Sequence, residues 1–306
     1  MTTHERLTQN ADAAPVLNVK DLVVEYPRRG HAPVRVLHGV GLDIRPGECV
    51  GLVGESGSGK TTLGRAVLGL APVHSGQIEF SGTDIAHASQ ARRRTLGSDI
   101  QVVFQDPYTS LNPSMTIGDI LAEPLQAKKV PKKQARERVR ELLEQVRLPK
   151  DSLSRMPREF SGGQRQRVAI ARALALEPRL IICDEPVSAL DLSTQARVLD
   201  LFVEIQERTG VAYLFITHDL SVVRHVSHRV AVMYRGEIVE WGETSKVTGS
   251  PEHPYTQRLW MAAPVPDPDA QEVRRAERRR LIAIQAEQDV QAGAAVGAPP
   301  LVDPAA

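Results

Sequence analysis

Cysteine is nearly absent from this chain of 306 residues, which contains only Cys49 and Cys183. Each lies within an apolar run, so the sequence predicts two buried thiols in a reducing compartment. Such a composition excludes a disulfide framework. It also excludes a cysteine-based zinc site, because no paired cysteine spacing occurs.

Neither sign of charge is in excess, because 38 basic residues are balanced by 37 acidic ones. This balance excludes a broad electrostatic attraction to nucleic acid or anionic lipid, and we expect no nucleic-acid partner. The chain also lacks an apolar stretch of transmembrane length, and its first residues do not have the pattern of a signal peptide. The sequence therefore predicts a cytoplasmic protein that reaches a membrane only by docking on another protein.

The chain does contain the patterning of an α/β fold. β-branched, partly alternating runs at 16–27 and 34–44 indicate antiparallel strands. Further along, apolar runs at 180–186, 211–219 and 229–242 alternate with a helical stretch at 194–210, which predicts a mostly parallel sheet. A helix-biased region at about 112–176 predicts an inserted helical subdomain.

Residues 54–61, GESGSGKT, match the phosphate-binding pattern G-x-x-x-x-G-K-[ST] between an apolar strand and a helix. Backbone N–H groups of such a loop wrap phosphates, Lys60 is expected to reach the β- and γ-phosphates, and the Thr61 hydroxyl is expected to help hold Mg²⁺. Taken alone, the motif predicts a nucleotide and nothing more specific. Nucleotide contacts are expected from Gly54, Glu55, Ser56, Gly57, Ser58, Gly59, Lys60, Thr61 and Thr62.

Polar side chains follow three other apolar runs. Asp184 is the expected metal ligand, and Glu185 beside it is the expected base that orients and deprotonates a water. Gln105 is expected to contact both the metal and the water, and His218 to donate a hydrogen bond to the γ-phosphate. Each residue taken alone is also compatible with an inert turn or cap, but together they would converge at the carboxyl ends of one sheet, where open α/β folds bind ligands.

A second anion-binding pattern occurs at 159–174, EFSGGQRQRVAIARAL, where a serine and two glycines start a predicted helix. Ser161 can cap that helix, and the small residues let backbone N–H groups face a phosphate. Ser161, Gly162, Gly163 and Gln164 lie in the predicted helical subdomain, away from residues 54–61. They would be idle in a monomer, so we expect them to close over a nucleotide held by another subunit.

From about residue 16 to 243, the sequence resembles the ATP-binding cassette (ABC) ATPases. Residues 54–61 match the Walker A motif of that family. Residues 160–164 match its signature, with Phe160 where many members have leucine. The resemblance implies a P-loop NTPase core with an antiparallel β subdomain and an inserted α-helical signature subdomain. It also implies a head-to-tail dimer in which each ATP lies between one chain's Walker A motif and the other chain's signature.

The resemblance assigns roles to further residues. The matched positions are Asp184 for the Walker B aspartate, Glu185 for the catalytic glutamate, Gln105 for the Q-loop and His218 for the switch histidine. Asp191 ends the run SALD, which resembles the D-loop that crosses the dimer interface. Tyr26 stands where the family places an aromatic residue that stacks on adenine, although an aromatic residue in a strand is more often part of the core. The expected cofactors are ATP and Mg²⁺, and we expect the chain to hydrolyse ATP.

Longer stretches resemble the ATPase subunits of oligopeptide and dipeptide importers, above all 250–268, SPEHPYTQRLWMAAPVPDP. Gln164 and the run 181–191 are more similar to the second, F-type subunit of such importers. The resemblance implies a second ABC ATPase subunit, either identical or related, two integral-membrane permeases and, indirectly, an extracytoplasmic solute-binding protein. The expected location is the cytoplasmic face of the cell membrane. No cysteine follows Cys183, which excludes the C-terminal iron–sulfur cluster of some members.

The expected division of the chain is a flexible N-terminus at 1–15, a nucleotide-binding domain at 16–249, an importer-type segment at 250–268 and a charged, Ala- and Pro-rich, partly disordered tail at 269–306. Peptides are the expected cargo; nickel chelates, glutathione and other small solutes remain open. A soluble ABC ATPase acting on DNA or the ribosome is disfavoured by the absence of a coiled-coil insertion. A P-loop kinase would not explain the signature, and a non-hydrolysing subunit would not need Glu185 and His218.

Overall fold

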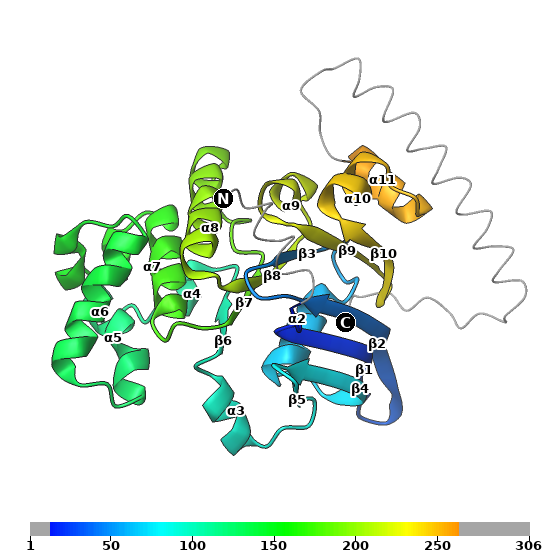
Figure 1. The fold of residues 1–306 in the computed structure, drawn as a ribbon, viewed down its shortest axis with the longest axis horizontal. Coiled ribbons are helices and arrows are strands. Elements are labelled where there is room, and N and C mark those ends of the chain that lie inside the picture. The colour runs from blue at the N-terminus through cyan, green and yellow to red at the C-terminus, as the bar shows by residue number, and fades with distance from the viewer. Residues whose placement is uncertain (1–12, 263–306) are drawn as a thin grey trace, which may run out of the picture.

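The computed structural model describes residues 13–262, which form two sheets with flanking helices (Figure 1). The predicted N-terminal segment up to residue 12, the end of the importer-type segment from residue 263 and the tail at 269–306 lie outside the described residues. The strands are β1 (Leu17–Arg28), β2 (His31–Ile44), β3 (Cys49–Val53), β4 (Val73–Phe80), β5 (Thr83–Asp84), β6 (Ile100–Val103), β7 (Leu180–Asp184), β8 (Ala212–Thr217), β9 (Arg229–Tyr234) and β10 (Glu237–Glu243). The helices are α2 (Lys60–Leu68), α3 (Gln90–Leu96), α4 (Pro107–Ser110), α5 (Ile117–Ala127), α6 (Lys132–Gln145), η1 (Lys150–Ser154), η2 (Pro157–Glu159), α7 (Gly162–Leu174), α8 (Leu192–Thr209), α9 (Leu220–Val226), α10 (Thr244–Gly249) and α11 (Pro254–Ala262).

The larger sheet has the order β10-β9-β3-β8-β7-β6, and its strands from β9 to β6 are parallel. Every residue of β3 and β8 is buried, as expected for parallel strands covered on both faces. Alternate residues of β7 point to opposite faces of the larger sheet, since Ile181 packs in one apolar cluster and Ile182 in another. The predicted α/β fold is confirmed, with β10 added as an antiparallel edge strand.

The smaller sheet has the order β2-β1-β4-β5 and is antiparallel throughout. Leu17 of β1 lies between Ile44 of β2 and Phe80 of β4, and the three side chains are buried in the same apolar cluster as Leu52 of β3. The antiparallel strands predicted at 16–27 and 34–44 are therefore confirmed, and their core is continuous with one face of the larger sheet.

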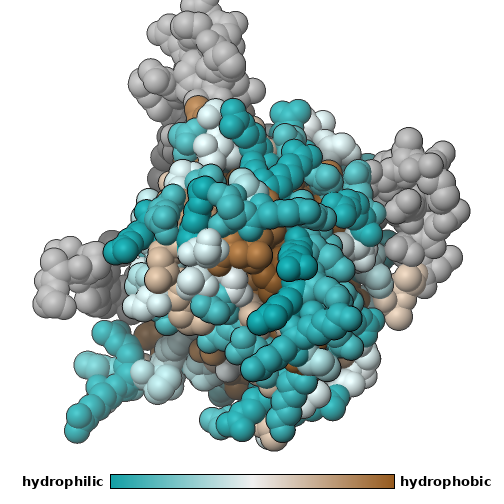
Figure 2. Space-filling model, turned by 90° about the vertical axis from the view of Figure 1, so that its left-hand side faces the viewer, coloured by the Kyte–Doolittle hydropathy of each residue, from teal (hydrophilic) through white to brown (hydrophobic). Residues whose placement is uncertain are grey.

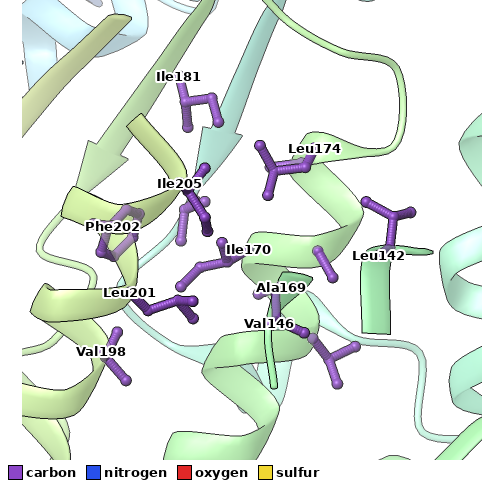
Figure 3. Packing of buried hydrophobic residues seen from close by; sticks show 14 of the residues in the cluster. Leu142, Val146, Ala169, Ile170, Leu174, Ile181, Val198, Leu201, Phe202 and Ile205 are labelled. Atoms are coloured by element: carbon purple, nitrogen blue, oxygen red, sulfur yellow. The ribbon is translucent and has the colours of Figure 1, made fainter. Parts of the chain in front are cut away.

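Helices α5, α6 and α7 lie at one side of the molecule (Figure 1). Helix α7 packs between α6 and the larger sheet. Helices α6, α7 and α8 and strand β7 share one apolar cluster. Its side chains include Leu142, Val146, Ala169, Ile170, Leu174, Ile181, Val198, Leu201, Phe202 and Ile205 (Figure 3). Burying a leucine- or isoleucine-sized side chain stabilises a fold by about 1.5–3 kcal/mol, so this shared core holds α7 firmly against β7 and α8. Within residues 13–262, no helix combines the length and the apolar composition needed to cross a bilayer.

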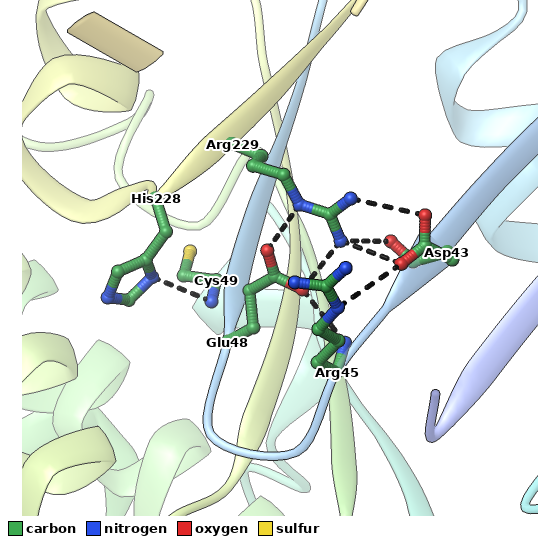
Figure 4. Close-up of polar contacts among 6 residues, drawn as sticks. All are labelled: Asp43, Arg45, Glu48, Cys49, His228 and Arg229. Atoms are coloured by element: carbon green, nitrogen blue, oxygen red, sulfur yellow. Dashed lines mark hydrogen bonds and ion pairs between the residues drawn. The ribbon is translucent and has the colours of Figure 1, made fainter. Parts of the chain in front are cut away.

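A cluster of charges joins the two sheets (Figure 4). The Arg229 guanidinium at the start of β9 donates through Nε to Glu48 Oε1 at 2.5 Å and through Nη2 to Asp43 Oδ2 at 2.8 Å. Asp43 belongs to β2, whereas Glu48, only 3% exposed, directly precedes β3. The guanidinium also lies over the Trp241 ring, 4.6 Å from its centroid. These contacts tie the antiparallel strands to the parallel sheet.

The two cysteines are free and fully buried, as predicted. Burial raises the pKa of the Cys49 thiol to about 12, and burial also raises the pKa of Cys183. Because only a thiolate reacts readily, we expect neither cysteine of the native protein to react with an aromatic disulfide reagent within minutes at about pH 8. Absorbance of the released thiolate should report two equivalents only after denaturation. Rapid release of one equivalent from the folded protein would contradict this burial.

Candidate nucleotide site

The loop at 54–59 connects the end of β3 to the start of α2. A Cβ atom added to Gly54 would run into the carbonyl oxygen of Met233 in β9, so only glycine allows this approach. Gly59 has a φ of 109°, in the left-handed region that favours glycine, and directly precedes α2. The predicted strand, loop and helix are all present, with the positive end of the α2 dipole at the loop.

The Lys60 ammonium lies inside this loop. Its Nζ atom donates to the carbonyl oxygens of Gly54 at 2.7 Å and Glu55 at 2.8 Å, and the residue is only 5% exposed. Burial lowers the pKa of Lys60, while the carboxylates of Glu185 and Asp184 act in the opposite direction. A cation is therefore held where the loop can surround an anion.

Asp184, at the end of β7, accepts a hydrogen bond from the Thr61 hydroxyl at 3.0 Å. Burial raises the pKa of Asp184, and the bond from Thr61 partly offsets that rise. A hydroxyl and a carboxylate are oxygen ligands of the kind that Mg²⁺ prefers. Residues 13–262 contain no group of three or more His, Cys, Asp or Glu side chains placed to hold a metal ion. This pair therefore fits Mg²⁺ only if phosphates and water supply further ligands.

Glu185 and His218 are brought together from different strand ends. His218 Nδ1, after β8, lies 3.0 Å from Glu185 Oε1, after β7. Glu185 has a φ of 48°, a left-handed conformation that is uncommon for a residue other than glycine. Its N–H donates to the carbonyl of Ile216 at 2.9 Å, which holds this turn against β8. The sequence predicts both residues at this sheet edge but gives no sign of the backbone conformation that makes them meet.

Gln105 and Tyr26 come from different sheets, Gln105 from the end of β6 and Tyr26 from β1. Gln105 follows β6, two residues beyond Val103, which pairs with Cys183 of β7. It is exposed and follows the strand next to the one that carries Asp184. Tyr26 in β1 is partly buried against the apolar cluster of the smaller sheet, so its ring already has a packing role.

The serine and glycines at the start of α7 form the helix cap that the sequence predicts. Ser161 Oγ accepts from Gln164 N at 3.3 Å, and Gln164 Oε1 accepts from Ser161 N at 2.9 Å. This capping box begins a helix that packs beside β6, three positions from β3 in the sheet. Because neighbouring strands are about 4.8 Å apart, β6 lies about 14 Å from β3 across the sheet, so α7 packs beside a strand other than the one that leads into the loop at 54–59.

Asp191 caps the neighbouring helix α8. Its Oδ1 accepts from Thr194 N at 3.0 Å and from Ser193 Oγ at 2.7 Å, and these bonds lower the pKa of Asp191. The cap starts α8 at Leu192, two residues before the predicted start. A Cβ atom on Gly163 would overlap Thr194 Cγ2, so the first turns of α7 and α8 touch.

Comparison with known proteins identifies the family. Residues 37–188 match the family described as ABC transporter, and residues 239–289 match the oligopeptide/dipeptide transporter C-terminal region. A putative peptide import ATP-binding protein of Brucella ovis is 51% identical over 257 residues, which cover 84% of this chain and 81% of that protein. The chain belongs to the ABC transporter family.

The shares of this chain and of its relatives that align differ from one relative to another. The oligopeptide transport ATP-binding protein OppD of Mycobacterium tuberculosis is 50% identical over 273 residues, which cover 87% of this chain but 45% of OppD. The chain therefore spans less than half of that relative's length. The dimeric ATP-binding cassette MJ0796, solved with ADP and Pi, is 28% identical with a TM-score of 0.66, covering 74% of this chain and 98% of that one. The assignment to the F-type subunit stays a prediction, since OppD is among the relatives at this identity.

Proposed function

We propose that this chain binds and hydrolyses MgATP at residues 54–62 and thereby powers an importer of di- or oligopeptides. One observation carries the proposal: the Thr61–Asp184 and Glu185–His218 contacts stand together at the carboxyl ends of the sheet. A phosphate loop, a metal-ligand pair and a base are thus combined at one sheet edge. The names of the relatives from Brucella ovis and Mycobacterium tuberculosis support peptides as the cargo.

The proposed chemistry follows from these positions. Lys60 leaves the carbonyls of Gly54 and Glu55 and donates to the β- and γ-phosphates. Thr61, Asp184 and Gln105 would hold Mg²⁺, whose charge neutralises the phosphate oxygens. Glu185 takes a proton from a water whose oxygen bonds to the γ-phosphorus, while the bond from that phosphorus to the β,γ-bridging oxygen breaks to leave ADP and phosphate. His218 orients the Glu185 carboxylate and donates to the γ-phosphate.

A second subunit completes the proposed site. Ser161, Gly162, Gly163 and Gln164 of each chain, with Asp191, would face the nucleotide held by the other chain, and Tyr26 would stack on adenine. The capped N-terminus of α7 directs the positive end of a helix dipole outward, which suits a phosphate. The dimeric form of the cassette MJ0796 supports this arrangement. The partner is a second ABC ATPase, either identical or related.

A hollow on the α5–α6 face is the surface we assign to a permease (Figure 2). Its apolar lining includes Ala122, Val130, Ala135, Val139 and Leu153, and its basic lining includes Lys129, Lys132, Arg136 and Arg140. An apolar hollow with a charged rim is typical of a protein-docking site. Docking of this hollow on one of two integral-membrane permeases, which receive solute from an extracytoplasmic binding protein, would hold the chain at the cytoplasmic face of the membrane.

Affinity capture of the full chain from gently solubilised native membranes tests this function. We expect mass spectrometry to identify two polytopic permeases and a second cassette ATPase. Ala122→Arg adds a further positive charge to the partly buried apolar lining of a hollow whose rim is already basic. Permease recovery should fall about tenfold or more, because an unpaired charge at an interface costs about 2 kcal/mol or more. Lys133→Glu, on the exposed face of α6, is the matched control and should retain the permeases. Recovery of soluble partners alone, such as ribosomal or DNA-repair components, would contradict the transport function.

A further inference from the structure

The C-terminal segment reaches the phosphate loop through one hydroxyl group. Tyr255, in the first turn of α11, accepts a hydrogen bond at its Oη from the backbone N–H of Glu55 at 2.8 Å. Tyr255 is 2% exposed, and its ring lies 4.2 Å from the Tyr234 ring at a tilt of 32°. Two hundred residues separate the donor from the acceptor, so the contact is made by the fold and not by local sequence.

The peptide unit between Gly54 and Glu55 is held at both of its polar atoms. Its carbonyl oxygen accepts from Lys60 Nζ at 2.7 Å, and its N–H donates to Tyr255 Oη at 2.8 Å. A trans peptide is planar, with these two groups on opposite sides, so fixing both sets the rotation of the plane. This peptide begins the loop, and its orientation determines where the N–H groups that follow it point.

The Tyr255 hydroxyl is itself well anchored. The two carboxylate oxygens of Glu240 accept the N–H groups of Glu252 at 2.9 Å and His253 at 3.0 Å, which fixes the approach to α11. The Tyr255 ring shares an apolar cluster with Val53, the residue directly before the loop. Burial raises the pKa of Tyr255, so the hydroxyl stays neutral at physiological pH. Its oxygen accepts the Glu55 N–H.

We propose that Tyr255 is a positioning residue for nucleotide binding: its hydroxyl holds the Gly54–Glu55 peptide so that the loop at 54–59 is shaped for phosphates before ATP arrives. The importer-type segment at 250–262 is then a structural part of the ATP site as well as a C-terminal addition. Preorganisation of this kind improves affinity, because less loop ordering accompanies binding. The inference rests on the proposed binding of MgATP at this loop.

Tyr255→Phe tests the inference because it removes the hydroxyl and keeps the ring. Calorimetric titration of the full chain with MgADP should give a Kd about five- to tenfold higher than that of the wild type, or about 1–1.4 kcal/mol. In steady-state ATPase assays, KM should rise by a similar factor while kcat stays within about twofold. Tyr234→Phe removes the hydroxyl of the stacked neighbour and is the matched control; its Kd should stay within about twofold of the wild type.

Two results would overturn the role of Tyr255 and leave the proposed function standing. The first is an unchanged Kd for MgADP in Tyr255→Phe when the wild type binds MgADP. The second is a rise in Kd in Tyr234→Phe as large as that in Tyr255→Phe. A lower Tm of Tyr255→Phe with unchanged KM would likewise reduce the residue to a structural role and overturn it. A wild-type chain that fails to bind MgADP would instead overturn the proposed function, and this inference with it.

Discussion

Replacing Glu185 with glutamine is expected to reduce ATP turnover by about 10²–10⁴-fold while leaving MgATP binding intact. The amide has the shape of the carboxylate but cannot accept the proton of the attacking water. It can still reach His218, whose Nδ1 lies 3.0 Å from Glu185 Oε1. Phosphate release measures the turnover, and size-exclusion chromatography with ATP should show a longer-lived dimer, since hydrolysis no longer separates the subunits.

Glu237→Gln makes the same chemical change on the exposed edge of β10 and should retain wild-type turnover. If Glu185→Gln hydrolysed ATP as fast as this control, the role of Glu185 as the base would be refuted. Loss of MgATP binding in Glu185→Gln would refute the separation of binding from chemistry at this site.

Arg229→Met is expected to lower the free energy of unfolding by about 3–5 kcal/mol, because it leaves the carboxylate of Glu48 buried without its partner. Glu48 is only 3% exposed and receives bonds from both Nε and Nη2 of Arg229, at 2.5 and 2.8 Å. For a chain of this size, Tm should fall by about 6–20 °C. Urea titration followed by circular dichroism measures the loss.

Lys20→Met is the control for this prediction. It breaks the ion pair with Glu79, 3.1 Å long, in which the lysine side chain is 51% exposed. Exposed pairs contribute about 0–1 kcal/mol, so we expect little change. If Arg229→Met and Lys20→Met lowered the free energy of unfolding equally, burial of the Arg229 cluster would not make its ion pairs more stabilising than an exposed pair (Figure 4).

The sequence predicts those features whose chemistry is local. The strand, loop and helix from Cys49 to Leu68 could be predicted because apolar runs, glycines and a helix start follow one another within a few residues. The cap at Ser161 could also be predicted, because its partner Gln164 is three residues away. The same holds for the sheet edge at which Asp184 and His218 stand, since strand ends in an α/β pattern lie on one side.

Contacts between distant segments could not be predicted in this way. Arg229 meets Glu48 across 181 residues, and no periodicity in either segment indicates the partner. The left-handed conformation of Glu185 depends on its N–H reaching Ile216 in β8, which requires the strand register. Resemblance marked the segment containing Tyr255 as typical of peptide importers but gave no indication that it touches Glu55.

The close approach of Gly163 to Thr194 joins two helix starts into one rigid corner. Ser161 caps one of these helices and Asp191 caps the other, so the two caps belong to helix turns that are in direct contact. In the proposed dimer, a nucleotide that attracts the first cap therefore also draws the second toward the partner chain. Subunit closure would then bring both helix caps onto the same nucleotide in a single concerted step.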